Sequence, residues 1–301
     1  MSTLLAFDTS YLYFRAFFGV PATFRAPDGT PVNAVRGTLD AIAALAEAYH
    51  PTVVAAAWDD DWRPAWRTAL VPSYKAHRVV AEGAEGPDAE ESPDDLAAQV
   101  PIIREALEAL GIAVIGAPEH EADDVLASLA AHHEGSSLIA TGDRDLFQLV
   151  DADTSVVYLG RGVAKRQLVT PAWLEATYHI PQDRYVDFSV LRGDPSDGLP
   201  GVKGIGEKSA SSLVSRYPSL AALGAAAVAG DPGLTPRMRS SLAAASDYLV
   251  AAEQVVRTVA SLEISEPSRV PIAVDEARLA EFAKRYSLAS SVRRVRAALG
   301  A

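Results

Sequence analysis

The sequence predicts an α/β fold: a parallel sheet covered by helices on both faces, followed by a smaller helical unit. Over the first 170 residues, short apolar runs alternate with longer segments of helical apolar spacing. Such alternation is typical of βαβ units. The predicted strands are residues 3–8, 52–59, 112–115 and 137–141, and the predicted helices include residues 34–49, 94–110 and 121–132.

Two further patterns mark where the sheet ends and the second unit begins. Residues 156–169 are typical of a hairpin, with Gly160 and Gly162 as turn residues. From about residue 171 the chain changes to short helical stretches broken by proline and glycine. We therefore predict an α/β domain over residues 1–170 and a helical domain over residues 171–301.

Composition limits the class of protein. Of the 301 residues, 49% are apolar and 22% are charged, which are values typical of globular domains. The sequence has no apolar run of about twenty residues, so we expect no membrane span. Its first residues also lack the basic start of a secretory signal. Because there is no cysteine, disulfides and thiolate metal sites are excluded. We expect a cytoplasmic protein with no membrane partner.

Aspartates follow three of the four predicted strands. Asp8 ends the first strand, Asp59 ends the second, and Asp143 and Asp145 come directly after the fourth. The carboxyl ends of parallel strands meet at one edge of a sheet, where ligands bind in open α/β folds. We therefore expect these side chains to face one crevice.

Five more carboxylates belong to two other acidic segments. Each has an alternative interpretation, because an acid at a helix start caps free amides and an acid in a turn bonds the backbone. These residues are Glu121, Asp123 and Asp124, at the start of a predicted helix, and Asp194 and Asp197, in a Gly-Asp-Pro-Ser-Asp-Gly turn.

Nine carboxylates at one edge would repel one another strongly unless cations were bound among them. Oxygen ligands without cysteine favour Mg²⁺ or Mn²⁺ over zinc. Two such ions about 4 Å apart clamp the attacking and leaving oxygens of a phosphoryl displacement. The net charge of −12 argues against a nucleic acid partner, but neutralising nine carboxylates would leave only −3.

A glycine- and lysine-rich string follows Asp197. Residues 199–210 read LPGVKGIGEKSA. Glycines there allow a tight turn whose amides face outward at a helix start, which is an anion site, and Lys203 and Lys208 add positive charge. Backbone amides that hold phosphates read no base sequence, so we expect recognition of duplex by its shape. The alternative is a glycine at the corner of a helix-turn-helix.

Basic and aromatic residues alternate after Asp59. Cations beside aromatic rings can hold a phosphate while the ring stacks a frayed base. The alternative is an amphipathic helix with buried tryptophans. The group consists of Trp62, Arg63, Trp66, Arg67, Tyr74, Lys75 and Arg78.

Together these strings resemble the bacterial 5′-nuclease family, which comprises the 5′-nuclease domain of DNA polymerase I, its phage relatives and stand-alone flap endonucleases. The resemblance covers residues 4–262. It implies a PIN-like core, a helical arch over about residues 75–100, and a helix–three-turn–helix over about residues 194–217 that holds duplex DNA and often K⁺. The arch, basic in the family, is acidic here.

The resemblance also assigns roles to residues. Asp8, Asp59, Glu121 and Asp123 would hold a first ion, and Asp124, Asp143, Asp145, Asp194 and Asp197 would serve a second, with a third ion left open. Lys75 would contact the scissile phosphate and Tyr74 would stack the terminal base. The other DNA contacts implied are Arg15, Arg67, Arg78, Lys203, Gly204, Gly206, Lys208 and Ser209.

We therefore expect a monomeric 5′-3′ exonuclease or flap endonuclease of replication and repair. Its expected substrates are branched, nicked or flapped DNA, or an RNA–DNA hybrid, cut to leave 5′-phosphate and 3′-hydroxyl ends, in partnership with a DNA polymerase and a ligase. One alternative is an aspartyl-nucleophile phosphohydrolase, although such enzymes usually have a second aspartate where Ser10 stands. The others are a non-catalytic DNA-binding module and a PIN-type ribonuclease, which would not need the glycine-lysine string.

Overall fold

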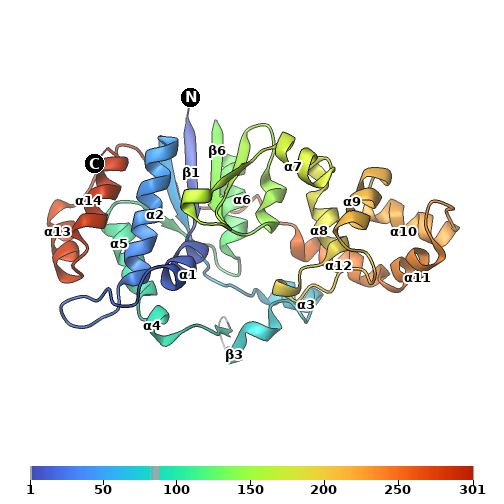
Figure 1. Ribbon diagram of the computed structural model, residues 1–301, viewed down its shortest axis with the longest axis horizontal. Coiled ribbons are helices and arrows are strands. Elements are labelled where there is room, and N and C mark those ends of the chain that lie inside the picture. The colour runs from blue at the N-terminus through green and yellow to red at the C-terminus, as the bar shows by residue number, and fades with distance from the viewer. Residues whose placement is uncertain (1, 82, 84–87, 301) are drawn as a thin grey trace.

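The computed structural model describes residues 2–81, 83 and 88–300. A sheet occupies the middle of an elongated molecule, and a helical unit extends from one side of it (Figure 1). Five strands are parallel, β8 pairs antiparallel with β7, and β9 pairs antiparallel with β2. In spatial order the strands are β5 (Ala113–Ile115), β2 (Val53–Ala57), β1 (Thr3–Asp8), β6 (Ser136–Thr141), β7 (Thr154–Tyr158) and β8 (Gln167–Val169), with β9 (Ser268–Arg269) beside β2.

Alternate residues of each strand pack into two apolar cores. Leu5 and Phe7 of β1 face one core, whereas Leu4 and Ala6 face the other. All four side chains are fully buried, as expected for a parallel sheet covered on both faces. The helices packed into the first core include α2 (Asn33–Tyr49) and α5 (Val100–Ala109), and those packed into the second include α6 (Ala122–His132), α7 (Pro171–Tyr178) and α8 (Tyr185–Arg192). The predicted fold class is therefore observed.

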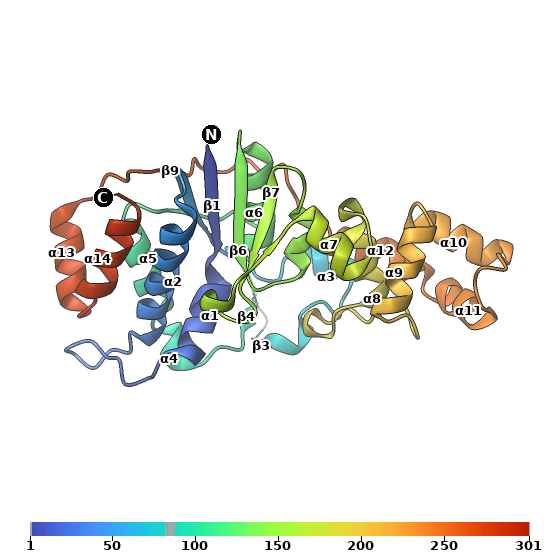
Figure 2. The ribbon, with the colours of Figure 1, turned by 45° about the horizontal axis from the view of Figure 1, so that its top comes forward.

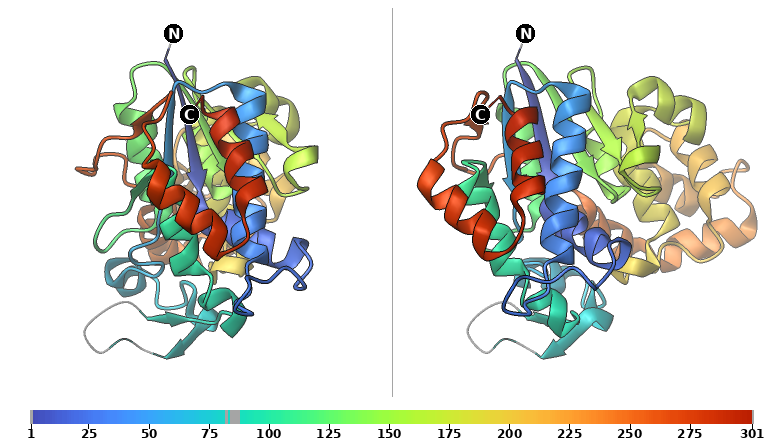
Figure 3. Two further views of the ribbon diagram at one scale, coloured as in Figure 1. Left: turned by 90° about the vertical axis from the view of Figure 1, so that its left-hand side faces the viewer. Right: turned by 60° about the vertical axis from the view of Figure 1, so that its left-hand side comes forward.

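The chain returns from the helical unit to the sheet. Helices α13 (Glu276–Arg285) and α14 (Ala289–Ala298) pack beside α2 and α5 on the face away from the helical unit (Figure 3). Phe282 and Val295 are buried in the same core as Leu5. This differs from the sequence-based division, which placed all of residues 171–301 in one helical domain. Local helical spacing shows that a helix is amphipathic, but not which surface its apolar face covers.

The predicted helix 94–110 is divided into α4 (Asp94–Ala97) and α5. Pro101 explains the division, because proline lacks the amide hydrogen that would bond the Ala97 carbonyl in a continuous helix. Gln99, between the two helices, is fully buried, and its Oε1 accepts a hydrogen bond from the Ala34 amide (2.8 Å) at the start of α2.

The helical unit projects from the sheet as a separate lobe (Figure 2). Its core is formed by leucine, valine and alanine side chains that are continuous with the α6 face of the sheet. Besides α8, the helices are α9 (Glu207–Arg216), α10 (Leu220–Ala229), α11 (Pro236–Ala244) and α12 (Ser246–Val256). No helix in the described ranges is long and apolar enough to cross a bilayer.

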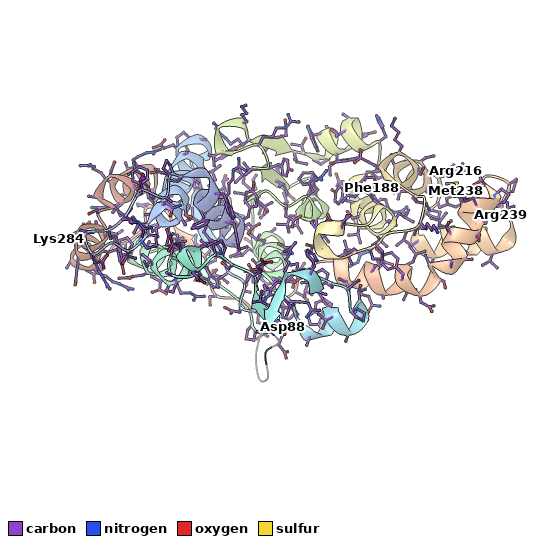
Figure 4. All side chains as sticks on the ribbon, turned by 60° about the horizontal axis from the view of Figure 1, so that its bottom comes forward. Asp88, Phe188, Arg216, Met238, Arg239 and Lys284 are labelled. Carbon is purple, nitrogen blue, oxygen red and sulfur yellow. The ribbon has the colours of Figure 1, made fainter. Side chains whose placement is uncertain are left out.

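The predicted acidic arch contains short structured pieces. Strands β3 (Val79–Ala81) and β4 (Ala89–Glu90) form a small antiparallel pair below the sheet, and Figure 4 shows Asp88 beside it. Asp88 accepts a hydrogen bond from Arg63. Residues 82 and 84–87 of the predicted arch lie outside the described residues. Between β2 and this pair lie α3 (Ala65–Leu70) and the 3₁₀ turn η1 (Ala76–Arg78).

Close contact between α1 (Thr9–Gly19) and α2 depends on Gly37. A Cβ atom at Gly37 would lie 2.7 Å from the Ala16 Cβ and 2.8 Å from the Val20 Cγ2. We expect Gly37→Leu to lower the free energy of unfolding by about 2–3 kcal/mol because the helices must move apart. Urea denaturation measures the change. The control is Gly224→Leu in α10, where a Cβ meets nothing within 4 Å, and an equal loss there would contradict the explanation.

Candidate active site

A cavity of about 520 Å³ lies at the carboxyl edge of the parallel strands. Strands β1, β2 and β6 all end there, at the point where the strand order reverses around β1. Six of the nine predicted carboxylates line it: Asp8, Asp59, Glu121, Asp123, Asp143 and Asp194.

Asp8 is the last residue of β1 and the N-cap of α1. Its Oδ1 accepts hydrogen bonds from the Tyr11 amide and the Ser10 hydroxyl, both at 3.0 Å, and its Oδ2 accepts from the Thr141 hydroxyl at 2.6 Å. Burial raises the pKa of Asp8, although these donors oppose the rise. Asp8 therefore both caps α1 and lines the cavity.

Asp59 and Glu121 meet at the start of α6. The Asp59 Oδ1 accepts a hydrogen bond from the Ala122 amide (2.8 Å), which ties the end of β2 to the helix. Glu121 is the N-cap of α6 and is 2% exposed. Asp123 is the second residue of α6. Burial and then the Asp143 carboxylate raise its pKa well above the ordinary aspartate value.

Asp143 and Asp145 lie in the turn after β6. The Asp143 Oδ1 accepts a hydrogen bond from the Asp145 amide (2.8 Å), which fixes the turn into η2 (Asp145–Leu149). Burial, with the Asp197 charge second, raises the pKa of Asp143 to about 6. Burial and Asp143 raise that of Asp145 well above its ordinary value. Such shifts reflect the burial of these carboxylates, to which repulsion between them adds.

Asp194 and Asp197 come from the turn that follows α8. Asp194 lines the main cavity, whereas Asp197 and Asp145 line a small adjoining space of about 10 Å³ that also touches Glu121 and Asp123. Arg192 lies 4.0 Å from Asp145 and 3.8 Å from Asp194. The second unit therefore contributes carboxylates to the same edge as the sheet.

Asp124 differs from its predicted place as an ion ligand. It is fully buried and does not line the cavity. Its Oδ1 accepts hydrogen bonds from Arg67 Nη2 (2.7 Å) and the Val259 amide (2.8 Å), and its Oδ2 accepts from the Glu121 amide (3.3 Å). Helical geometry explains this, because successive positions are turned by about 100°, so Asp124 faces the protein while Asp123 faces the cavity.

Two predicted DNA contacts are also buried. Arg67 is 2% exposed and pairs with Glu121 and Asp124. Tyr74 is 4% exposed, and its hydroxyl donates to the Glu121 carboxylate (3.0 and 3.1 Å) rather than leaving its ring free to stack a base. The alternation of basic and aromatic residues did not show which of them face inward.

The remaining predicted cations of this segment face the carboxylates. Lys75 Nζ donates to Glu121 Oε2 (3.0 Å), and Arg78 Nη2 donates to Asp197 Oδ1 (2.7 Å). Burial alone would lower the pKa of Lys75, but the charges of Glu121, Tyr74, Asp197 and Asp123 together outweigh it and raise this pKa well above the ordinary value. Arg15 is exposed, and its Nη1 donates to the Tyr11 hydroxyl (3.3 Å) near the cavity.

The glycine-lysine string forms an exposed turn into α9. Gly204 has φ +82°, a left-handed conformation that favours glycine, and the N-cap Gly206 leaves the first amides of α9 without a side-chain cap. Lys203 and Lys208 are exposed and Ser209 is half-buried. Sequence reasoning missed Arg237, whose guanidinium would lie 3.7 Å from a Cβ at Gly204.

Glu90 is a cavity residue that the sequence did not reveal. It lies on β4 and lines the cavity with Lys75 and Arg78, 3.9 Å from the Arg78 guanidinium. Burial raises its pKa. No motif marks it, because it is one acid among many in the acidic segment, so only the position of β4 identifies it.

Oxygen ligands and uncompensated negative charge fit a site for hard divalent cations. Among the residues described, no group of three or more Asp, Glu or His side chains is arranged to hold one ion as it stands. Glu121 and Asp197 instead form ion pairs with Lys75 and Arg78.

Two family descriptions match the chain along most of its length. The description "5′-3′ exonuclease, N-terminal resolvase-like domain" matches residues 3–179, and "5′-3′ exonuclease, C-terminal SAM fold" matches residues 180–282. A parallel sheet with a carboxylate-lined edge and a helical lobe is thus the scaffold of a nuclease. The chain belongs to the 5′-3′ exonuclease family, which confirms the predicted relationship and enzyme class.

Similar proteins agree with this assignment. The chain is 48% identical over 292 residues to a 5′-3′ exonuclease of Streptomyces coelicolor, covering 96% of this chain and 97% of that protein. It is 47% identical over 311 residues to a 5′-3′ exonuclease of Mycobacterium tuberculosis, covering 99% and 98%. Its fold resembles the bacteriophage T5 flap endonuclease in complex with DNA and metal ions (TM-score 0.64, 14% identity, 99% and 98% covered).

The raised pKa of Asp143 predicts a pH-dependent stability. Because this pKa of about 6 lies above the ordinary value of 3.8, the folded form holds a proton that the unfolded form loses. The contribution of Asp143 to the free energy of unfolding is thus fully present at low pH and is lost as pH rises from about 4 to 6. In EDTA, we expect Asp143→Asn to raise the free energy of unfolding at pH 7.5 by about 2–3 kcal/mol and to change little at pH 4.

Calorimetry at the two pH values measures this change. Asp183→Asn is the matched control, because Asp183 is exposed and lies outside the cavity. If Asp143→Asn instead lowers the free energy of unfolding at pH 7.5, the charged Asp143 carboxylate does not destabilise the folded protein.

Proposed function

We propose that this chain is a divalent-metal-dependent nuclease that cuts branched, nicked or flapped DNA, or an RNA–DNA hybrid, at a 5′ end. The observation that carries the proposal is that six of the nine predicted carboxylates line one cavity at the sheet edge. The similar T5 flap endonuclease was solved with DNA and metal ions, which supports both parts of the proposal.

The proposed ligands are the six cavity carboxylates with Asp145 and Asp197 beside them. Mg²⁺ or Mn²⁺ suits such an all-oxygen set. Bound in pairs, these ions would activate a water and neutralise charge at the phosphate. Ser10 and Thr141 keep Asp8 pointed at the cavity through the hydrogen bonds described above.

Lys75 and Arg78 are proposed to exchange partners when substrate arrives. Each now neutralises a carboxylate, at 3.0 and 2.7 Å, so each is already placed at the cavity where a phosphate must lie. If cations held Glu121 and Asp197, Lys75 and Arg78 would be free to contact the phosphate. There they would stabilise the negative charge that develops during displacement. The cut would leave a 5′-phosphate and a 3′-hydroxyl.

Substrate selection is assigned to the helical lobe. Gly204, Gly206 and Ser209 offer backbone amides, and Lys203, Lys208 and Arg237 surround them with positive charge. Such a turn holds phosphates without reading bases, so duplex of any sequence beside a 5′ end would fit. A K⁺ ion bound at this turn would strengthen duplex binding by adding positive charge near the phosphates.

Cellular partners follow from the product. A 5′-phosphate beside a 3′-hydroxyl is what a ligase joins, and a DNA polymerase generates the displaced 5′ end. We therefore propose that the chain acts as a monomer in the cytoplasm, in partnership with these two enzymes. An aspartyl-nucleophile phosphohydrolase fits less well, because Ser10 donates to Asp8 where a second acid is needed.

Removing a cavity carboxylate should abolish cleavage without abolishing DNA binding. We expect Asp123→Ala and Asp143→Ala to cut a 5′-labelled double flap roughly 1000-fold more slowly with Mg²⁺ or Mn²⁺, because metal catalysis supplies several kcal/mol. A gel shift in EDTA should show unchanged duplex binding, and Asp183→Asn serves as control. Wild-type cleavage that persists in EDTA would contradict the metal site.

Neutralising the exposed turn should weaken duplex binding. In Lys203→Ala/Lys208→Ala we expect the affinity for duplex to fall and the slope of log K against log salt to flatten by about two, one for each lost phosphate contact. Fluorescence anisotropy over a salt series gives the slope. The control is Lys284→Ala at the far end of the molecule from this turn (Figure 4). An unchanged slope in the double variant removes the turn from the DNA interface.

A further inference from the structure

Arg67 is one of the largest fully buried side chains of the described residues. It lies on α3, between the sheet edge and the helical lobe, and its guanidinium joins two carboxylates of the α6 start. The distances are 3.1 Å from Nη1 to Glu121 Oε2 and 2.7 Å from Nη2 to Asp124 Oδ1. A buried cation between two acids holds both in place, since removing any member leaves an uncompensated charge.

We propose that Arg67 and Asp124 are positioning residues of this active site, holding Glu121 against the cavity and fastening the start of α6 to the chain that returns from the helical lobe. This inference rests on the proposed nuclease function. Neither residue lines the main cavity. Arg67 reaches only the adjoining space of about 10 Å³, which has no room for a nucleotide.

Glu121 needs such support because Lys75, another of its partners, leaves it in the proposed reaction. Its carboxylate accepts hydrogen bonds from Tyr74 and from Lys75. When Lys75 turns to a phosphate, Arg67 and Tyr74 are the groups that still aim Glu121. Partners of this kind around metal ligands commonly set ligand orientation and metal affinity.

The returning chain, residues 256–262, is hydrogen-bonded to α6 and to η2, the elements that begin at the acidic edge of the sheet. The Val259 amide donates to the same Asp124 oxygen that pairs with Arg67 (2.8 Å), and the Ser128 hydroxyl of α6 donates to the Val259 carbonyl (3.0 Å). On η2, Gln148 accepts from the Thr258 amide (3.0 Å) and donates to the Val256 carbonyl (2.9 Å). Asp124 therefore links Glu121 to the lobe that carries the duplex-binding turn.

The test compares Arg67→Lys and Asp124→Asn with matched controls. Arg184 and Asp187 form another shielded Arg–Asp pair, at 2.5 Å in the helical lobe, so Arg184→Lys and Asp187→Asn carry the same changes away from the cavity. Each folded variant is measured for Mn²⁺ binding by electron paramagnetic resonance without DNA. Duplex affinity over a salt series and single-turnover cleavage at saturating flap DNA are measured in parallel.

For Arg67→Lys we expect Mn²⁺ affinity and the single-turnover rate to fall about tenfold or more, with duplex affinity and salt slope unchanged. For Asp124→Asn, which keeps an oxygen acceptor for Arg67 and Val259 but loses the negative charge, we expect a smaller fall in Mn²⁺ affinity, about threefold. Asp123→Asn should lose much more, roughly tenfold or beyond. If Arg67→Lys does not fold, Arg67→Met/Asp124→Leu replaces the pair by apolar groups and should show the same loss.

Three results would overturn the proposal. A salt slope lowered by about one in Arg67→Met/Asp124→Leu, which removes the positive charge, would make Arg67 a phosphate contact. Loss of Mn²⁺ in Asp124→Asn equal to that in Asp123→Asn would make Asp124 a ligand. Equal losses in Arg184→Lys would reduce the effect to general destabilisation. A wild-type chain that neither binds Mn²⁺ nor cuts DNA would instead defeat the proposed function.

Discussion

Repulsion between carboxylates at one edge of the sheet is the interaction on which the rest of the molecule depends. Six of the predicted carboxylates share one cavity with Glu90, two more lie beside it, and burial raises the pKa of Asp8, Asp123, Asp143 and Asp145. A fold tolerates such a group only when cations compensate it. Without metal, Lys75, Arg78 and Arg192 supply part of that compensation.

The same backbone features that build the fold also place these acids. Asp8 caps α1, Glu121 caps α6 and Asp194 caps the short turn η5 (Pro195–Asp197). A carboxylate at a helix start bonds free amides and complements the helix dipole, which offsets part of the cost of gathering charge. Capping and metal binding are therefore not competing explanations here, because a single oxygen can cap while the other faces the cavity.

Two cores of different extent support this edge. One continues from the α6 face of the sheet into the helical lobe, so the lobe that carries the exposed glycine-lysine turn is packed directly against the acidic edge. The other is closed by α13 and α14, which return from the lobe to cover α2 and α5 (Figure 3). The molecule thus joins a duplex-binding turn to the sheet edge through apolar packing and through residues 256–262.

The sequence by itself determined the parallel sheet, the alternation of helices and the edge at which Asp8, Asp59 and Asp143 meet. It could do so because strand ends of a parallel sheet share one side whatever their separation along the chain. The family followed from the acidic segments together with the glycine-lysine string, since these are local motifs.

Only the tertiary structure decided which polar side chains face inward. Arg67, Tyr74 and Asp124 share motifs with cavity residues but are buried, and Glu90 faces the cavity without any motif. It also decided that α13 and α14 close the sheet rather than extend the lobe. The physical reason is the same in each case: periodicity fixes the spacing of a residue within its own element, whereas the partner that the residue meets depends on how distant elements pack.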